Sequence, residues 1–503
     1  MGVQKKGETM KYFNLSERFE WLTKSKVMGL IALRQFVLSL SLPALVLMSL
    51  PALAFIPLQF QKPNNPHFHQ QWALHNPSTG IDINIFPLWW EVPKTQTPIR
   101  IAVIDTGFVP TADLGDNIFI NWTERRGLAQ VDDDLNGYVD DIYGVNMLRP
   151  QQVPIDDSGH GSHVIGIIAA QGNNGLGIAG VAQNVEIIPI KYLDSKNYGL
   201  LKHAAEGIHY AIDQGARIIN ASWGTGSLWG GESSSPKELD EALARAERKG
   251  VLIVAGAGND RLNNDTNPFY PASSPFNNII SVAAINRHGE LWRDQDSRFG
   301  SNYGPNSVHI AAPGDEILSY NSQGDLVYDR GTSMAAPHVA GVAALILSRE
   351  PELKATDIKE RLMNTARPLA SLRDRVVSGG MVSAYHAVHN ILPEPDPNDP
   401  FNWRSVPWEA RTLSPYPRNY RERFEFHVPG AQRLAVHFAS FSMARSAPVN
   451  VLDGQGRQVA VMTGSYSNKF SPVVEGDTLI LDMDFEFAVS LRGFVVDKVA
   501  VDR

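Results

Sequence analysis

The stretch Gly331-Thr332-Ser333-Met334-Ala335-Ala336-Pro337-His338 leads from a glycine turn into a run of small and apolar residues that ends near Leu347. This run is apolar on nearly every side, which is typical of a buried helix. Ser333 would then lie at the N-terminus of the helix, where unpaired backbone N–H groups and the helix dipole stabilise developing negative charge. A hydroxyl nucleophile placed there obtains part of an oxyanion hole from its own backbone. Taken alone, the stretch is also compatible with a plain turn into a core helix.

Short apolar runs alternate with helical patterns from Ile101 to about Leu392. Buried strands are predicted at residues 101–104, 185–190, 217–220, 251–255 and 279–283, and helices at 163–170, 200–214, 237–249, 335–348 and 355–364. This alternation predicts an α/β fold, a doubly wound and mostly parallel sheet with helices on both faces. Such folds place their sites beyond the carboxyl ends of the strands.

The composition sets further limits. The chain has 503 residues, which suggests two domains or more, and an apolar fraction of 43%, which supports a large core. The net charge is −8, so no general attraction to nucleic acid or to membrane surfaces is expected. There is no cysteine, which excludes disulfides, thiolate nucleophiles and cysteine metal sites.

The first 54 residues have the layout of a secretory signal peptide. Several lysines and arginines, the last of them Arg34, precede the largely apolar run Phe36–Leu50, and Ala52-Leu53-Ala54 supplies a small-x-small cleavage signal. An uncleaved signal anchor is the alternative, but the apolar run is short for a spanning helix and contains Pro43. We therefore expect cleavage, no stable membrane span afterwards, and a secreted or cell-envelope protein.

The remainder divides into four parts. Residues 55–98 form an N-terminal extension that is too short for a folded inhibitory pro-domain, and residues 81–90 are expected to pack on the next domain. Residues 99–392 form the α/β domain, and the proline-rich run from Pro393 begins a linker assigned to 393–412. Residues 413–503 are predicted to form a small antiparallel β-sandwich. Its strands are expected at 424–428, 433–438, 449–452, 458–462, 478–482 and 494–499.

Three polar residues follow or begin predicted elements of the α/β domain at glycine-marked turns. Asp105 follows the first strand, where a carboxylate can hold a histidine in one tautomer. His160 opens a helix in Gly159-His160-Gly161, and a neutral imidazole suits proton transfer near pH 7. Asn259 ends a strand and a glycine-flanked turn, from which its amide could donate to an oxyanion opposite Ser333. His163 is expected to be a core residue.

Two other kinds of site are compatible with some of these residues. Asp105-Thr106-Gly107 with Asp157-Ser158-Gly159 could form an aspartic peptidase pair, but both lie in a βα pattern rather than in repeated β-lobes. His160 and His163 could bind zinc, but the sequence supplies neither an intervening glutamate nor an evident third ligand.

Together, these motifs resemble those of the subtilisin-like serine peptidases. The matching stretches are Ala102–Gly107, His160–Val164, Ala255–Asn259 and Gly331–Gly341, in that order along the chain. The chain order Asp, His, Ser and an asparagine at the oxyanion are known features of this family. The resemblance implies that Ser333 attacks the substrate carbonyl, His160 transfers its proton, Asp105 orients His160, and Asn259 stabilises the oxyanion. It also implies protein or peptide substrates, bound by two segments: Ser222, Trp223, Gly224 and Ala255, Gly256, Ala257.

An acidic run suggests bound calcium. Asp132, Asp134 and Asn136 alternate around a turn at Gly137 as in a calcium loop, and Asp140 or Asp141 could replace the missing terminal glutamate. The alternative is a solvated acidic loop. The stretch Asn173–Val181 resembles a second calcium loop of the family, which implies Asn174 as the side-chain ligand and backbone carbonyls as the others.

The predicted C-terminal sandwich resembles the CUB-like or P-domain-like modules that follow some subtilase domains. The match rests on Pro417–Tyr420, Val451–Gly454 and Gly493–Asp497. Binding of a glycan, binding of a protein and stabilisation of the first domain all stay open for it.

The sequence therefore predicts a secreted serine endopeptidase that hydrolyses peptide bonds through a triad and an acyl-enzyme, with structural calcium. A catalytically silent surface binding protein and an acyl transferase or peptide ligase on the same fold are the two alternatives. We also expect folding without autoprocessing at a pro-domain.

Overall fold

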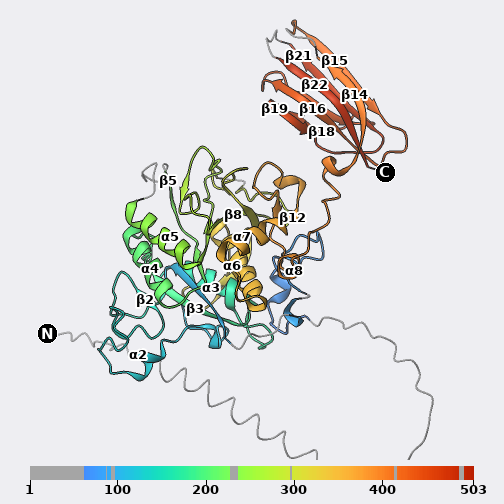
Figure 1. Ribbon diagram of the computed structural model, residues 1–503. Coiled ribbons are helices and arrows are strands. Elements are labelled where there is room, and N and C mark those ends of the chain that lie inside the picture. Colours follow the sequence, from blue (N-terminus) through green and yellow to red (C-terminus); the bar gives the residue numbers. More distant parts are fainter. Residues whose placement is uncertain are drawn as a thin grey trace, which may run out of the picture. The chain divides into compact units, whose positions relative to one another are not determined.

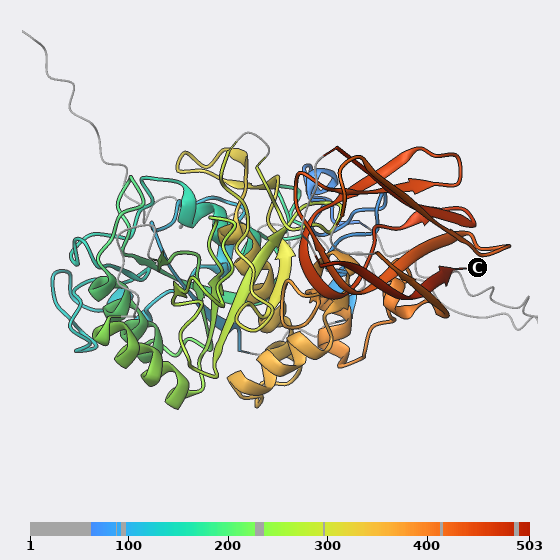
Figure 2. The ribbon, with the colours of Figure 1, turned by 90° about the horizontal axis from the view of Figure 1, so that it is seen from above.

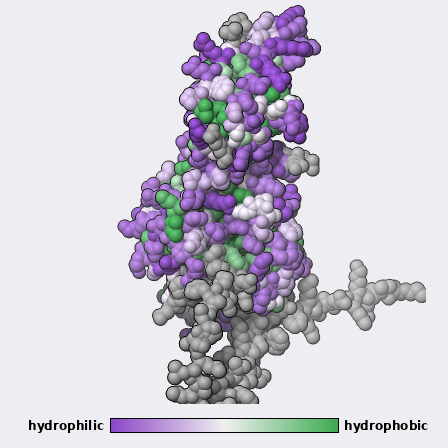
Figure 3. All heavy atoms as spheres, turned by 90° about the vertical axis from the view of Figure 1, so that its right-hand side faces the viewer, coloured by the Kyte–Doolittle hydropathy of each residue, from purple (hydrophilic) through white to green (hydrophobic). Residues whose placement is uncertain are grey.

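The computed structural model describes residues 62–86, 88–91, 97–226, 236–294, 297–412, 416–486 and 492–502. The predicted signal peptide lies outside these residues. Within the described ranges, no helix combines the length and the apolar character that crossing a membrane requires. Figure 3 shows one face of the molecule, on which hydrophilic side chains predominate and hydrophobic ones gather in small separate patches.

A nine-stranded sheet forms the centre of the first domain (Figure 1). Its order is β12-β13-β9-β8-β6-β4-β1-β3-β2, and all neighbours are parallel except β12 and β13. The strands are β1 (Ile99–Asp105), β2 (Val145–Asn146), β3 (Val185–Lys191), β4 (Ile218–Ala221), β6 (Leu252–Gly256), β8 (Ile279–Ile285), β9 (Ile310–Pro313), β12 (Arg367–Pro368) and β13 (Gly380–Met381). The predicted α/β fold class is confirmed.

Helices cover both faces of this sheet, as Figure 2 shows from above, with the green helices α4 and α5 apart from the gold α6 and α7. The helices are α2 (Trp122–Arg126), α3 (His160–Ala169), α4 (Leu201–Asp213), α5 (Lys237–Lys249), α6 (Thr332–Arg349), α7 (Ala355–Asn364) and α8 (Ala384–His389). In α5 the buried residues recur at helical spacing: Leu239, Ala242, Leu243 and Ala246. Such a helix needs only one apolar face, whereas α6 is buried along nearly its whole length and packs on β1, β4, β6, β8 and β9.

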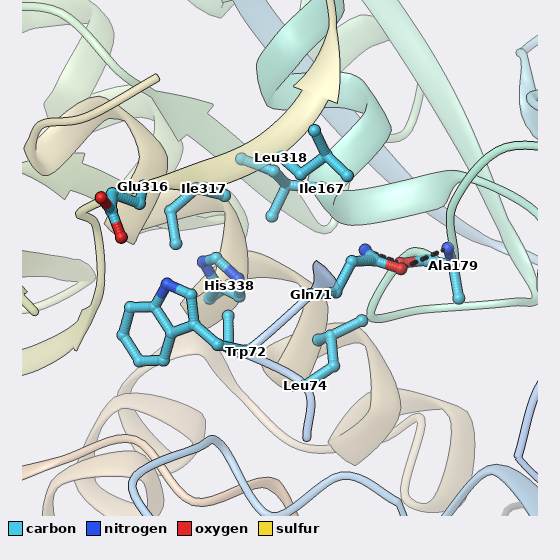
Figure 4. A pocket seen from close by; sticks show the side chains of 10 residues that line it. Gln71, Trp72, Leu74, Ile167, Ala179, Glu316, Ile317, Leu318 and His338 are labelled. Atoms are coloured by element: carbon cyan, nitrogen blue, oxygen red, sulfur yellow. Dashed lines mark hydrogen bonds between the residues drawn. The ribbon is translucent and has the colours of Figure 1, made fainter. Parts of the chain in front are cut away.

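The segment before β1 packs on this domain, as predicted for residues 81–90. It contains two 3-10 helices, Phe68–Gln70 and Leu88–Trp90, and its buried side chains include Phe68, Trp72, Ile83, Ile85 and Leu88. The Gln71 side chain accepts from the Ala179 N–H at 2.9 Å and donates to the Ala179 carbonyl at 2.8 Å (Figure 4). The Trp72 indole donates to the Asp315 carbonyl at 2.9 Å.

The C-terminal domain consists of two antiparallel sheets around a separate core. One sheet contains β14 (Arg404–Arg411), β22 (Gly493–Asp502), β16 (Arg433–Met443), β19 (Gly464–Phe470) and β20 (Val474–Glu475). The other contains β15 (Tyr420–His427), β21 (Thr478–Phe485), β17 (Val449–Asp453) and β18 (Gln458–Met462). The predicted antiparallel architecture is confirmed, but the linker predicted at residues 393–412 is too long. Residues 404–411 form β14 beside β22. The strand is not evident from the sequence, because its outward positions are charged and it contains Pro407.

Two smaller pairs complete the described elements. These are β5 (Thr225–Gly226) with β7 (Phe269–Tyr270), and β10 (Ile317–Tyr320) with β11 (Leu326–Asp329). Short 3-10 helices lie at Gly115–Asn117, Ala370–Leu372 and Pro400–Asn402.

Candidate active site

The carboxyl ends of β1, β4 and β6 define the candidate site. These strands are neighbours in the sheet, and β1 lies between β3 and β4. The chain runs first to β3, on one side of β1, and only later to β4, on its other side. Such a reversal of strand order opens a crevice at the carboxyl edge of a parallel sheet. Asp105 is the last residue of β1, Ser222 follows β4, and Asn259 lies just beyond β6. The topology therefore collects the predicted site residues at one edge.

Asp105 and His160 form a hydrogen-bonded pair. Asp105 is fully buried, and its Oδ1 lies 2.8 Å from His160 Nδ1 and accepts the Thr106 N–H at 2.7 Å. Burial by itself would lower the pKa of His160, but the charge of Asp105 and its hydrogen bond more than offset this and raise the pKa to about 9. The carboxylate thus fixes the ring orientation and favours the imidazolium.

Asp156, which the sequence analysis did not single out, holds the start of α3. Its Oδ1 accepts from the Thr106 hydroxyl and the Gly159 N–H, and its Oδ2 accepts from the Ser162 N–H and hydroxyl, at 2.6 to 2.8 Å. Burial opposes ionisation of this group, but these hydrogen bonds lower its pKa overall. Because Asp156 joins Thr106, beside Asp105, to the residues that flank His160, it fixes the spacing of the Asp105–His160 pair.

A buried lysine supports the same region. Lys191 ends β3 and donates from Nζ to the Thr106 carbonyl at 2.7 Å, the Leu193 carbonyl at 2.9 Å and Asp157 Oδ1 at 2.6 Å. Asp157, the partner that an aspartic peptidase would require for Asp105, is therefore the ion-pair partner of Lys191. His163 is buried, and burial lowers its pKa to about 4, in line with the predicted core role.

Ser333 is the second residue of α6, so it lies at the helix N-terminus as predicted. Its hydroxyl donates to the Ser222 carbonyl at 3.1 Å, while the Ser222 hydroxyl donates to the Ser333 carbonyl at 2.8 Å. This reciprocal pair fixes the start of α6 against the end of β4. Ser333 and His160 line the same cleft.

Asn259 is oriented by the residue next to Ser333. Its Oδ1 accepts from the Thr332 N–H at 2.9 Å and from the Thr332 hydroxyl at 3.0 Å. Because Oδ1 of Asn259 already accepts these two bonds, the side-chain nitrogen of Asn259 is the atom that can donate a hydrogen bond. A donor in this place is suited to an anionic oxygen that develops beside Ser333.

The cleft has a volume of about 710 Å³. Of the predicted substrate-binding residues, Ser222, Trp223, Gly224 and Gly256 line it. Ala255 and Ala257 are fully buried and lie beneath the surface, which corrects that part of the prediction. The physical reason is the alternation of strand side chains, because only every second residue at the end of β6 faces the cleft. Trp223 packs edge-to-face on Tyr192, with ring centroids 5.0 Å apart.

The acidic run does gather carboxylates, but in a different set from the predicted one. Carboxylate oxygens of Glu124, Asp134 and Asp141 lie within 4.8 Å of one another, and Glu124 and Asp141 are buried. Asp132 instead accepts backbone N–H groups of the turn, and Asp140 accepts the Gln130 N–H. Asn136 donates from its amide to Asp134 and Asp141. Of the predicted ligands, Asp134 and Asp141, the latter offered as an alternative to Asp140, belong to the cluster, whereas Asp132, Asn136 and Asp140 do not.

The second predicted loop forms a cradle of oxygen atoms. The amide nitrogen of Asn65 lies 2.6 to 3.1 Å from four acceptors: the carbonyls of Gln171, Leu176 and Ile178, and Oδ1 of Asn174. Asn174 also donates to Asp113 at 2.6 Å. Asn65 and Asp113 were not predicted, because both come from distant parts of the sequence and meet the loop only in the fold.

The chain is similar to known proteins of one family. The family model described as "Subtilase family" matches residues 96–387. Subtilisin-like protease 1 of Plasmodium berghei is 35% identical over 307 residues, 58% of this chain and 50% of the relative. The cell wall-associated protease of Bacillus subtilis is 37% identical over 309 residues, 60% of this chain and 30% of the relative. The chain thus spans half or less of the length of these relatives.

A solved structure described as a protease from Pseudoalteromonas arctica is similar at a TM-score of 0.53 and 29% identity, and the match covers 66% of this chain and 99% of that one. The family model alone covers more than half of this chain and includes β1, α3, β6 and α6, the elements that carry the candidate site. This chain therefore belongs to the subtilase family.

Proposed function

We propose that this protein is an exported serine endopeptidase that uses Asp105, His160 and Ser333 as a catalytic triad. The observation that carries the proposal is the 2.8 Å bond between His160 Nδ1 and the buried Asp105, in a cleft that also contains Ser333 at a helix N-terminus. This arrangement supplies an oriented base and a hydroxyl beside unpaired backbone donors.

The reaction would proceed in two stages. Ser333 Oγ attacks the substrate carbonyl carbon while His160 Nε2 takes the hydroxyl proton, and the Asn259 amide and the Ser333 N–H stabilise the oxyanion. The C–N bond then breaks, and the proton on His160 passes to the leaving amine. Water attacks the acyl-serine ester in the second stage with His160 again as base, which releases the carboxylic acid and restores Ser333. Asp105 stays ionised throughout.

Fluorophosphonate labelling tests this proposal. We expect the folded protein to be labelled at Ser333, because the reagent reacts with activated serines, and Ser333→Ala to remain unlabelled. Ser467→Ala, which removes an exposed hydroxyl of the C-terminal domain, is the control, and it should retain labelling. Folded wild-type protein that resists the reagent would contradict the proposal and favour the silent binding protein.

We also propose that calcium binds the cluster of Glu124, Asp134 and Asp141. Hard oxygen donors are the ligands that calcium prefers, and two buried carboxylates beside a third are costly without a compensating charge. Burial raises the pKa of Asp141, as expected for a carboxyl group held among other acids. Asn121 and Asn136 donate to Asp134 and Asp141, which orients both carboxylates toward the cluster.

A thermal shift titration distinguishes calcium binding from a merely acidic loop. Calcium added to chelator-treated protein should raise the free energy of unfolding by about 2.7 kcal/mol at a hundredfold excess over Kd. Glu124→Gln should lose most of this increment, whereas Glu352→Gln, at an exposed position, should keep it. An equal increment in both variants would exclude the cluster. Asn174→Ala tests the second loop in the same way, because there a cation would have to displace the Asn65 amide.

Export is the remaining part of the proposal. The N-terminus of the protein recovered from outside the cytoplasm should lie directly after Ala54. Recovery of the protein with residues 1–54 still attached would support the signal anchor instead.

A further inference from the structure

Two glycine-bearing segments face one another across the cleft beside Ser333. One is Ser222–Gly224, which follows β4, and the other is Gly256–Asn259 at the end of β6. Glycines leave space next to the backbone, and parallel β4 and β6 hold the two segments side by side. This slot lies next to the oxyanion donor Asn259, so it would receive the side chain of the substrate residue whose carbonyl is attacked.

The ring of Phe269 lies in this slot. A Cβ atom on Gly224 would be 2.2 Å from Cε1 and 2.7 Å from Cζ of the ring, and one on Gly258 would be 3.2 Å from Cγ. One aromatic ring thus occupies the space beside Gly224 and also lies close to Gly258, so it stands between the two segments. Phe269 also lines the cleft, so the ring is the surface that an entering side chain would meet.

The backbone holds this ring in place. Phe269 begins β7, which pairs with β5 so that Gly226 lies opposite Phe269. The Phe269 N–H donates to the Ser273 hydroxyl at 3.1 Å, and the ring packs on the core cluster of the first domain. Since β5 directly continues the Ser222–Gly224 segment, the ring and the segment that it contacts are parts of one unit.

Charge gives little discrimination in the cleft. Besides His160, which belongs to the proposed triad, the described charged residues that line it are Lys196, Arg330, Asp260 and Asp294, two of each sign. Shape is therefore the stronger selector.

We propose that Phe269 restricts the substrate residue on the acyl side of the cut to a small side chain, such as glycine, alanine or serine. The inference rests on the proposed peptidase function. A bulky aromatic or long aliphatic side chain would have to displace a ring that is packed on two sides, and overpacking of this kind is unfavourable.

The test compares two peptides that differ only in the residue before the cut, alanine in one and phenylalanine in the other. The measured quantity is the ratio of their kcat/KM values, which does not depend on the fraction of active protein. We expect the wild type to favour alanine by about 100-fold, the upper range for rejection on size alone. Phe269→Ala should reduce this ratio by at least about 10-fold.

Phe276→Ala is the matched control, because Phe276 packs on the same core cluster and does not line the cleft. Its ratio should equal that of the wild type. If Phe269→Ala failed to fold, the relative inactivation of the wild type by peptidyl phosphonates ending in alanine or phenylalanine would test the same preference.

A wild type that cleaves both peptides equally well would overturn the inference, as would a ratio that Phe269→Ala leaves unchanged. Both results assume Ser333-dependent labelling. A folded protein without that labelling would instead refute the peptidase function, and the inference with it.

Discussion

At the scale of single residues, two opposing effects act on His160. Burial disfavours its charged form, whereas Asp105, bound to Nδ1, favours it and prevails, so the pKa lies near 9. The neighbouring His163 and His338 are buried without such a partner acid, and their pKa values are lowered to about 4. The pKa of His160 thus differs from those of the other two histidines because a carboxylate is bound to its ring, and this difference can be measured.

The first prediction concerns the pH dependence of activity. Only neutral His160 can accept the Ser333 proton, so kcat/KM should rise with pH through about 9 and level off above it. Asp105→Asn removes the charge that raises the pKa, so the rising limb should move to lower pH while the plateau falls about 10⁴-fold. A profile of the wild type and the variant with one peptide substrate measures both effects. A limb at the same pH in the two proteins would show that Asp105 does not control the titration.

The site residues that could be predicted from the sequence are those that have a clear local pattern around them. Asp105, His160, Asn259 and Ser333 each lie beside a strong strand or helix signal and a glycine, so their placement could be predicted. Phe269 lies in Asn267-Pro268-Phe269-Tyr270-Pro271, which has no periodicity, and its position in the slot depends on contacts with distant glycines. Glu124 precedes the acidic run on a separate short helix. Contacts of this kind arise only when the chain is folded.

At the scale of elements, the packing of α6 on the sheet fixes the position of Ser333 in the candidate site. The helix packs on five strands of the sheet and also on α3, so Ser333 is attached to a helix that is buried along nearly its whole length. Small residues permit this packing. A Cβ atom on Gly341 would lie 2.6 Å from Cβ and from Cγ1 of Val181, which is closer than atoms can approach.

Gly341→Ala is therefore expected to destabilise the protein by about 1–3 kcal/mol, although alanine favours a helix more than glycine does. Urea unfolding of wild type, the single variants and the double variant measures the effect. Val181→Ala removes Cγ1 and Cγ2 and keeps Cβ, so it relieves part of the overlap, and the double variant should be more stable than the sum of the single changes by about 0.5 kcal/mol or more. Strict additivity would show that the two residues do not limit the packing.

At the scale of the whole molecule, the segment of residues 62–91 is part of the fold of the first domain. It contributes Phe68, Trp72, Ile83, Ile85 and Leu88 to the core, and its Asn65 fills the oxygen cradle near Asn174. Burial of five such side chains is worth about 7–15 kcal/mol before the cost of ordering the chain. This is comparable with the whole stability of a typical domain, about 5–15 kcal/mol. A removable inhibitory segment would not be embedded in this way.

The last prediction follows from this comparison. A protein that starts at Thr97 should fail to give a cooperative thermal transition and should not be labelled by fluorophosphonate, because the surface under the segment becomes exposed. A protein that starts at Lys62 is the matched control, since it keeps every described residue of the segment, and it should unfold at the same temperature as one that starts directly after Ala54. Greater labelling of the protein that starts at Thr97 would mean that the segment inhibits rather than supports the site. An unchanged transition would mean that the buried contacts of the segment contribute little to the stability of the domain.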